Sequence, residues 1–271
     1  MHRTCAESDE CFTEISAGDV GVLGVTTVDD ELFVLLHQES DQVTVYSIND
    51  YQLVRHLNLP GFKPDPFSDL TSCVRYRCLY MSDCANKCID IYDLVSSAIS
   101  KWPVPGKPYG LSVTPSCNLL VTCQEPNKLV ELSAESGQCV HEIRLQSDIV
   151  GPYHGIKLTT GQFVICHCRG KSLHRVCTVD GNGAVTRSYG GQRSSDVGQL
   201  KWPLHLAEHK RLHLIIVVEC ENGRIVLLSR ALQFLSYICK RLSSPHRLHF
   251  DNTTRRLYVG QVLGDIVVIQ L

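Results

Sequence analysis

The feature that most constrains the fold is a pair of short alternating segments that recurs along the chain. At Cys78–Leu94 the sequence CLYMSDCANKCIDIYDL places apolar residues at alternate positions on both sides of a polar turn. This period-two pattern is typical of a β-hairpin with one buried face. Equivalent segments, each followed by a polar turn and another apolar strand, begin at Leu32, Leu119, Phe163, Leu214 and Leu257.

A strand that begins with proline precedes most copies of the pair. It starts at Pro108, Pro152, Pro203 and Pro245, and a looser version starts at Pro66. Successive prolines are 42, 44, 51 and 42 residues apart, and a fourth alternating segment closes most units. Four short strands in each of six repeats predict a single all-β domain, a six-bladed β-propeller of four-stranded antiparallel blades. The predicted blades lie near 17–61, 66–106, 107–147, 150–191, 199–239 and 243–271.

The two ends of the chain are predicted to meet in the last blade. The sixth unit stops at Leu271 after only three strands, and an unpaired strand edge of that kind favours aggregation. Residues 11–16, CFTEIS, alternate in the same way and have no other strand to pair with. We therefore expect this segment to supply the fourth strand of the last blade and to close the ring.

Composition argues against several classes of function. The chain has fourteen cysteines but no apolar segment after its polar start, MHRTCAESDE, so we expect a cytoplasmic protein whose thiols lie in the core. No C-x-x-C pair occurs, which argues against a zinc finger. The net charge of −2 argues against DNA or an anionic membrane as a partner. Serine-triad, phosphate-loop and dinucleotide motifs find no support, and no cofactor is predicted.

The repeat units resemble NHL repeats. Leu79–Asp83, Asn86 and Ile89–Tyr92 match the strand, turn and strand of that family, and GGQRSSDVGQLKWPLHLA at 190–207 is similar to its linker between blades. The nearest resemblance is to the C-terminal propellers of tripartite-motif (TRIM) proteins. The chain carries no RING, B-box or coiled-coil sequence. The resemblance therefore implies a non-catalytic module, monomeric as an isolated domain, that recognises a protein partner.

The innermost strands of a propeller line a central channel, so residues just after the repeated proline are expected to converge at one mouth of it. Aromatic, imidazole and guanidinium groups gather at these positions, and such groups favour partner recognition. We expect that replacing Tyr153 and His205 together by alanine weakens binding and leaves stability nearly unchanged. The predicted channel-mouth site consists of Tyr109, Tyr153, His154, His205, His246 and Arg247.

RNA is the first alternative partner. Some TRIM-NHL propellers bind RNA, and basic side chains beside stacking aromatics suit single-stranded RNA. Several basic residues, such as Lys210–Arg211 and Arg255–Arg256, fall in predicted turns between the first and second strands of a blade. Such turns are also commonly charged for solubility alone. The candidate RNA contacts are Arg75, Tyr76, Arg77, Arg169, Lys171 and Arg175.

A metal-dependent lyase or hydrolase is the second alternative. Some NHL-type propellers, such as peptide-amidating lyases, hold a metal in the channel, and His154, His205 and His246 are predicted to lie near the axis. No acidic residue stands at the equivalent positions of the repeats, and no nucleophile–base pair is evident from spacing. The sequence therefore predicts neither a metal site nor catalytic residues.

Overall fold

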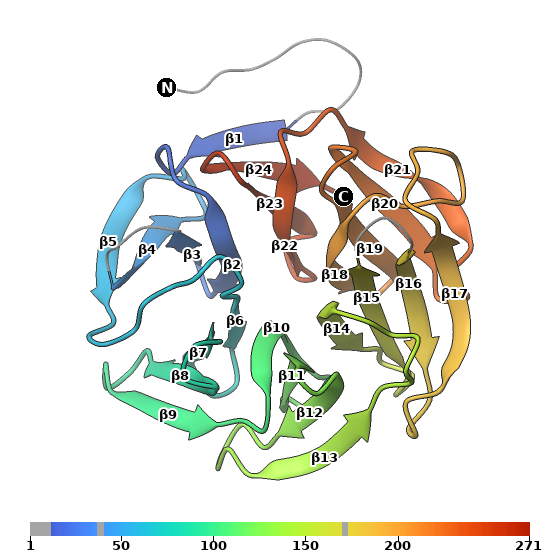
Figure 1. Cartoon of the computed structure of the whole chain (residues 1–271). Coiled ribbons are helices and arrows are strands. Elements are labelled where there is room, and N and C mark those ends of the chain that lie inside the picture. Colours follow the sequence, from blue (N-terminus) through green and yellow to red (C-terminus); the bar gives the residue numbers. More distant parts are fainter. Residues whose placement is uncertain (1–11, 37–40, 170–172) are drawn as a thin grey trace.

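The computed structural model describes residues 12–36, 41–169 and 173–271, which form six four-stranded antiparallel sheets arranged as a ring (Figure 1). The six-bladed propeller predicted from the repeats is confirmed. Within the described part of the chain, no helix is long and apolar enough to cross a membrane.

Each blade runs from an innermost strand beside the axis to an outermost strand at the periphery. The first three blades are β2 (Val22–Val28), β3 (Glu31–Leu36), β4 (Gln42–Ser47) and β5 (Leu53–Asn58); β6 (Leu70–Cys73), β7 (Cys78–Asp83), β8 (Cys88–Asp93) and β9 (Ile99–Pro103); and β10 (Lys107–Val113), β11 (Leu119–Gln124), β12 (Lys128–Leu132) and β13 (Cys139–Arg144). The last three are β14 (Pro152–Lys157), β15 (Phe163–Arg169), β16 (Leu173–Val179) and β17 (Val185–Gly191); β18 (Pro203–His209), β19 (Leu214–Glu219), β20 (Arg224–Ser229) and β21 (Phe234–Lys240); and β22 (Pro245–Asp251), β23 (Arg256–Gln261), β24 (Asp265–Gln270) and β1 (Phe12–Ser16).

The central strands of a blade are buried on both faces. In β7, Leu79 and Met81 pack with Phe33 of the first blade, whereas Tyr80 packs with Val121 of the third. The expectation of a hairpin with only one buried face is wrong here, because each blade is sandwiched between two others. Burial on both faces also explains why such strands read as nearly continuous apolar runs.

The thiols belong mainly to this core. Nine of the twelve described cysteines are buried. Burial raises the pKa of Cys123 to about 12, so this thiol stays protonated at neutral pH. The described cysteines therefore behave largely as the small apolar residues that their abundance suggested.

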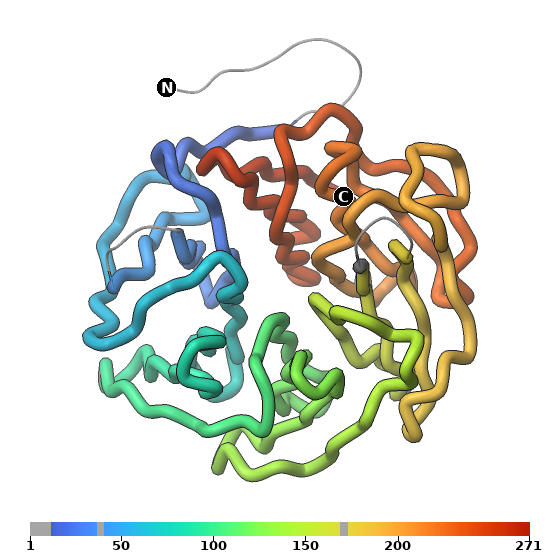
Figure 2. Tube along the Cα trace, in the orientation of Figure 1, coloured from blue at the N-terminus to red at the C-terminus, as the bar shows by residue number. Residues whose placement is uncertain are grey.

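The ring is closed by strands from opposite ends of the chain. The short strand β1 pairs with β24 along its whole length, from Phe12 opposite Ile269 to Ser16 opposite Asp265. Figure 2 shows this N-terminal strand lying beside the C-terminal segment. Ile15 is buried in the core cluster between the last and first blades. The predicted closure of the last blade is thus confirmed for residues 12–16.

We expect Ile15→Ala to lower the free energy of unfolding by about 2–4 kcal/mol, because it removes buried methyl groups and leaves a cavity at the closure. Urea denaturation followed by tryptophan fluorescence measures the change. Ser16→Ala is the matched control, because Ser16 lies in the same strand but is exposed. A loss below about 0.5 kcal/mol for Ile15→Ala would show that the closing strand contributes little to stability.

Candidate functional site

A β-bulge after the repeated proline decides which predicted residues enter the channel. In the fourth blade the pairing shifts between Pro152 and His154, and it shifts in the same way before His205 and before Arg247. An extra residue on one strand bends that strand and redirects the side chains around it. The predicted site therefore splits into residues within the bulge (Tyr109, Tyr153, His246) and residues just after it (His154, His205, Arg247).

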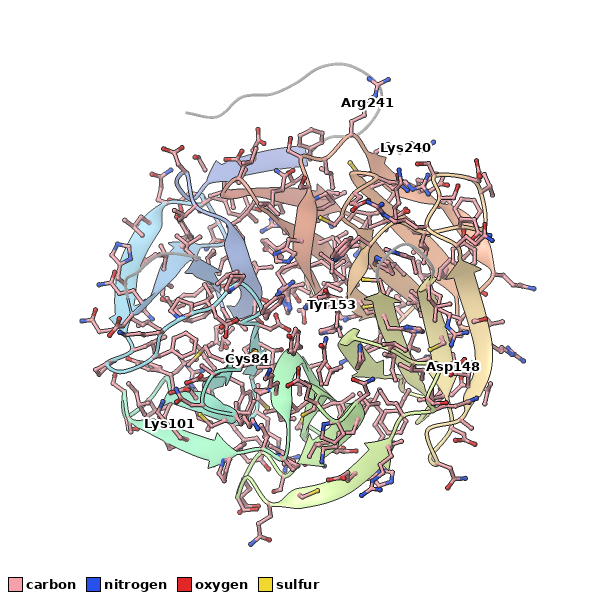
Figure 3. The ribbon with its side chains drawn as sticks, in the orientation of Figure 1. Cys84, Lys101, Asp148, Tyr153, Lys240 and Arg241 are labelled. Atoms are coloured by element: carbon pink, nitrogen blue, oxygen red, sulfur yellow. The ribbon has the colours of Figure 1, made fainter. Side chains whose placement is uncertain are left out.

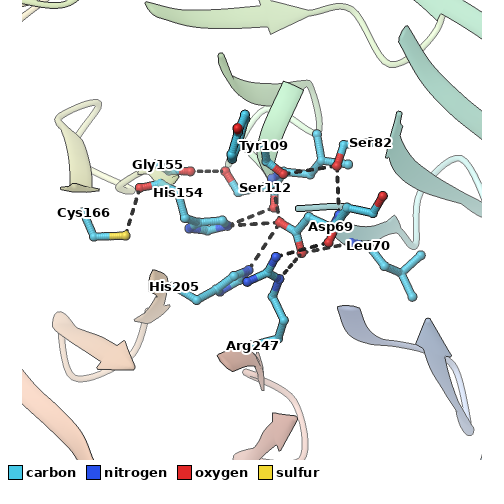
Figure 4. Close-up of polar contacts among 12 residues, drawn as sticks. Asp69, Leu70, Ser82, Tyr109, Ser112, His154, Gly155, Cys166, His205 and Arg247 are labelled. Atoms are coloured by element: carbon cyan, nitrogen blue, oxygen red, sulfur yellow. Dashed lines mark hydrogen bonds and ion pairs between the residues drawn. The ribbon is translucent and has the colours of Figure 1, made fainter. Parts of the chain in front are cut away.

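The residues after the bulge meet Asp69 inside the channel (Figure 4). His205 Nε2 lies 3.4 Å and His154 Nε2 lies 3.9 Å from Oδ2 of Asp69, and Arg247 Nε lies 3.6 Å from its Oδ1. These four side chains come from four different blades, and all of them are buried. We name this group the axial cluster.

Backbone groups satisfy the two charged members of the axial cluster. Asp69 accepts the N–H of Leu70 on Oδ1 at 2.9 Å and the N–H of Leu111 on Oδ2 at 2.8 Å. Arg247 donates its Nε–H to the carbonyl of Leu23 at 2.8 Å and its terminal nitrogens to two further carbonyls. A buried ion pair that is also hydrogen-bonded in this way is tolerated in the interior.

The electrostatics of the axial cluster favour an ionised Asp69. Burial by itself raises the pKa of this carboxyl, but His205, Arg247 and His154 outweigh burial and hold the pKa well below its usual range. Burial also lowers the pKa of His154, to about 3, so this ring is neutral at neutral pH. The lasting counter-charge to Asp69 is therefore the Arg247 guanidinium.

The two histidines fit because the third blade has glycine at the equivalent position. Their rings stack with centroids 3.6 Å apart, and His154 Nε2 lies 3.0 Å from the carbonyl oxygen of Leu111. A Cβ atom at Gly110 would come within 2.8 Å of Cδ2 of His154. The same Cβ atom would come within 2.4 Å of the carbonyl oxygen of Tyr153, so any side chain at Gly110 would displace both the backbone of β14 and the imidazole.

The axial cluster contains the atoms of a possible cation site but does not fit a metal. One ligand atom from each of Asp69, His154 and His205 lies within 4.8 Å of the others, so the expectation that no acidic residue accompanies the channel histidines is wrong. However, Arg247 already neutralises the carboxylate, and a second cation beside the guanidinium would be repelled. The cluster is better described as an internal ion pair flanked by two imidazoles.

Asp69 is absent from the predicted site because its repeat is irregular. It stands three residues after Pro66, whereas the other cluster residues stand two residues after their prolines. The signal that identifies it is the apolar residue that follows. Leu70 follows Asp69 as Leu206 and Leu248 follow the corresponding residues of the fifth and sixth blades.

Residues of the bulges cover one end of the channel. The ring of Tyr109 lies 5.0 Å from that of Phe67 and 6.0 Å from that of Tyr153, between centroids. Figure 3 shows Tyr153 close to the axis. Beneath these rings only a void of about 10 Å³ remains. We name this end, which carries the linkers between blades, the plug face.

Half of the predicted channel-mouth residues are therefore buried and do not contribute to a surface. Tyr109, Tyr153 and His246 are partly exposed at the plug face, whereas His154, His205 and Arg247 lie beneath it in the axial cluster. Burial, with Arg247 as a further cause, also lowers the pKa of His246 well below its usual value. The expectation that the Tyr153 and His205 double alanine variant keeps its stability does not fit a buried His205 in contact with Asp69.

The opposite end of the channel is open. A cavity of about 360 Å³ lies there, surrounded by the turns between the first and second strands of the blades. His249 lines its wall and its Nε2 lies 2.8 Å from Oγ1 of Thr27, while Arg75 and Lys210 stand at its rim. Burial lowers the pKa of His249 to about 4. We name this cavity the funnel and this end of the molecule the funnel face.

The candidate RNA contacts do not form one patch. Arg75, Tyr76 and Arg77 lie in the turn between β6 and β7, on the funnel face. Arg175 lies near the start of β16 and pairs at 2.5 Å with Asp148, which belongs to a blade linker of the plug face. Lys171 and the side chain of Arg169 lie outside the described residues. The predicted RNA-contacting set is thus divided between opposite faces.

Comparison with known proteins identifies the fold alone. No protein-family model and no curated protein matches the sequence. A virginiamycin B lyase from Staphylococcus aureus is similar in structure, with a TM-score of 0.67 and 13% identity over 97% of this chain and 100% of that one. A streptogramin B lyase gives a TM-score of 0.67 and 14% identity over 96% and 87% of the two chains, and Kuenenia stuttgartiensis hydrazine synthase gives 0.64 and 16% over 89% and 74%. At these identities, the likeness shows that the chain is a β-propeller of the kind these proteins contain, and no more.

Proposed function

We propose that the chain is a non-catalytic interaction scaffold that binds a protein partner at the funnel face. The observation that carries this proposal is the difference between the two ends of the channel. Aromatic rings cover one end, whereas the other opens into a cavity of about 360 Å³. A preformed concave site on a rigid scaffold is the usual setting for recognition.

Exposed apolar side chains beside the funnel support a macromolecular partner. Val74 and Leu212 are 58% and 57% exposed, and they stand in the turns that also carry Arg75 and Lys210. Aliphatic and cationic side chains around a cavity combine desolvation with charge pairing when a partner binds. The NHL-like motifs at Leu79–Asp83 support the same general role, because they resemble the recognition propellers of TRIM proteins.

The axial cluster supports a structural role for the channel interior. Its carboxylate and guanidinium use their hydrogen bonds on backbone groups and form an ion pair with each other, and the cluster contains no hydroxyl or thiol nucleophile. Because lyases are among the solved propellers of similar shape, the fold by itself does not decide between binding and catalysis. The proposal therefore depends on the site and not on the fold.

The direct test replaces one exposed leucine on each face. Leu212→Asp on the funnel face is expected to weaken capture of partner proteins about tenfold, because it puts a charge into the apolar rim. Leu263→Asp is the matched control, since Leu263 is 64% exposed but lies in a turn of the plug face. Quantitative affinity capture from cells with the two variants and the parent chain measures the effect. If only the Leu263 variant loses its partners, the proposed face is wrong.

A further inference from the structure

The inner turns of the funnel face carry an excess of positive charge. These are the turns between the first and second strands of the six blades, and they contain five Lys or Arg residues but only two acids. The basic residues are Arg75, Arg77, Lys210, Arg211 and Arg255, and the acids are Asp29 and Asp30. The excess arises in a chain whose net charge is −2, so it is a local property of these inner turns.

Most of this positive charge has no internal partner. Arg77 pairs with Asp29 at 2.5 Å, but no carboxylate of the described residues lies within ion-pair distance of Arg75, Lys210, Arg211 or Arg255. Two acids line the cavity, and both are already engaged. Glu208 accepts hydrogen bonds from Thr159 and pairs with Arg230 at 2.8 Å, and Asp251 accepts hydrogen bonds from Thr253 and Thr254. Cations that flank a cavity without counter-charges attract an anionic ligand.

The rim and the cavity of the funnel together favour a polypeptide as the anionic ligand. Val74 and Leu212 lie beside the unpaired cations and offer aliphatic surface, which suits apolar side chains next to acidic ones. The funnel, about 360 Å³, lies within the size range of sites that bury a few side chains. RNA fits these turns less well, because the bases of single-stranded RNA stack on several aromatic rings. Tyr76 is the one aromatic residue of the inner turns, and the Arg75 guanidinium already lies 5.7 Å from its ring.

We propose that the funnel binds an acidic segment of the protein partner. Carboxylates of that segment pair with Arg75 and Lys210, and its aliphatic side chains pack against Val74 on one side of the funnel and Leu212 on the other. This proposal rests on the proposed function and adds to it the chemistry of the partner.

The first test measures binding of a defined peptide to the whole chain. The probe is a fluorescein-labelled peptide of about a dozen residues built from repeats of Glu-Leu-Asp-Glu, and the readout is fluorescence anisotropy. We expect it to bind at least about tenfold more tightly than a control peptide in which every acid is replaced by its amide. Binding is expected to weaken as salt is raised. Equal affinity for the two peptides would overturn the proposal.

The second test reverses the charge of the rim. Arg75→Glu combined with Lys210→Glu is expected to weaken binding of the acidic peptide about tenfold or more. The control combines Lys63→Glu with Arg241→Glu, which changes the net charge equally but at exposed positions in linkers of the plug face; Figure 3 places Arg241 at the periphery. The control is expected to stay within about twofold of the parent chain. Equal losses in both double variants would mean that only overall charge matters, and the proposal would fail.

Two further outcomes separate the possible failures. If a labelled oligouridylate of the same length binds more tightly than the acidic peptide and loses affinity in the rim variant, the funnel is an RNA site and the proposal is overturned. If Leu212→Asp loses its partners but the acidic peptide does not bind, the partner chemistry is wrong and the proposed face stands. If the acidic peptide binds specifically but Leu212→Asp captures its partners as the parent chain does, the proposed face is wrong and the affinity for acidic peptides stands.

Discussion

Replacing Asp69 by asparagine is expected to lower the free energy of unfolding by about 3–5 kcal/mol, because it leaves a buried guanidinium without its counter-charge. The carboxylate lies 3.6 Å from Arg247 Nε and is 1% exposed, so water does not compensate for the loss. Asparagine keeps the shape of the side chain, but its amide nitrogen must face the N–H of either Leu70 or Leu111, so the loss combines the charge with one hydrogen bond. Urea denaturation at neutral pH measures the effect.

Two further variants identify the cause of this loss. Asp29→Asn removes an acid from an ion pair with Arg77 whose side chains are about half exposed, and it is expected to cost no more than about 1 kcal/mol. Combining Asp69→Asn with Arg247→Gln is expected to recover part of the stability, since no unpaired charge then remains buried. An Asp69→Asn variant as stable as the Asp29 control would show that the axial ion pair contributes nothing to the fold.

Three buried or partly buried histidines are expected to cost the protein about 5–6 kcal/mol of stability between about pH 7 and pH 5. Burial lowers the pKa of His154 to about 3 and the pKa values of His167 and His249 to about 4, whereas an unfolded histidine titrates near 6.5. As the pH falls through this window, these histidines become protonated in the unfolded chain but stay neutral in the folded chain. Each of the three histidines therefore shifts the balance toward unfolding by about 2 kcal/mol. Asp69 does not contribute to this loss, because its lowered pKa affects stability only at pH values below the ordinary pKa of a carboxyl group.

Urea denaturation at the two pH values tests this expectation. The variant His249→Gln is expected to remove about 2 kcal/mol of the pH dependence, because it deletes one of the rings whose pKa is lowered in the folded chain. His213→Gln is the control, since it also replaces a histidine but at an exposed position in a turn of the funnel face. A free energy of unfolding that changes by less than about 1 kcal/mol between the two pH values would contradict the account.

The fold is predictable from the sequence because its signals are local. Alternation along segments such as Leu79–Asp83, the proline before each inner strand and the spacing between copies all act within one blade, and they specify strand, turn and repeat number. The closure by residues 12–16 is also predictable, since an alternating segment without a partner can pair with the unpaired edge of the last blade. What local signals do not contain is the packing between blades, which buries both faces of β7.

The candidate site depends on details that periodicity does not reveal. A one-residue bulge sends Tyr153 to the plug and His154 into the axial cluster, although the two are adjacent in sequence. Asp69 comes from a repeat with one additional residue, so simple counting from the proline misses it. Which end of the channel is open depends on how far the rings of Tyr109 and Phe67 reach across the axis, and that follows from tertiary packing.

The pairing of β1 with β24 gives the molecule a property that open arrays of repeats lack. In a solenoid the terminal units have one neighbour each and need special capping sequences, and stability is roughly a sum over units. In this ring each blade has a neighbour on both sides, so there is neither a first nor a last one. Fraying cannot start at a terminal unit, and the loss of any one blade exposes the flanks of two others. The six sheets therefore form a single cooperative unit, which is closed by the pairing of β1 with β24.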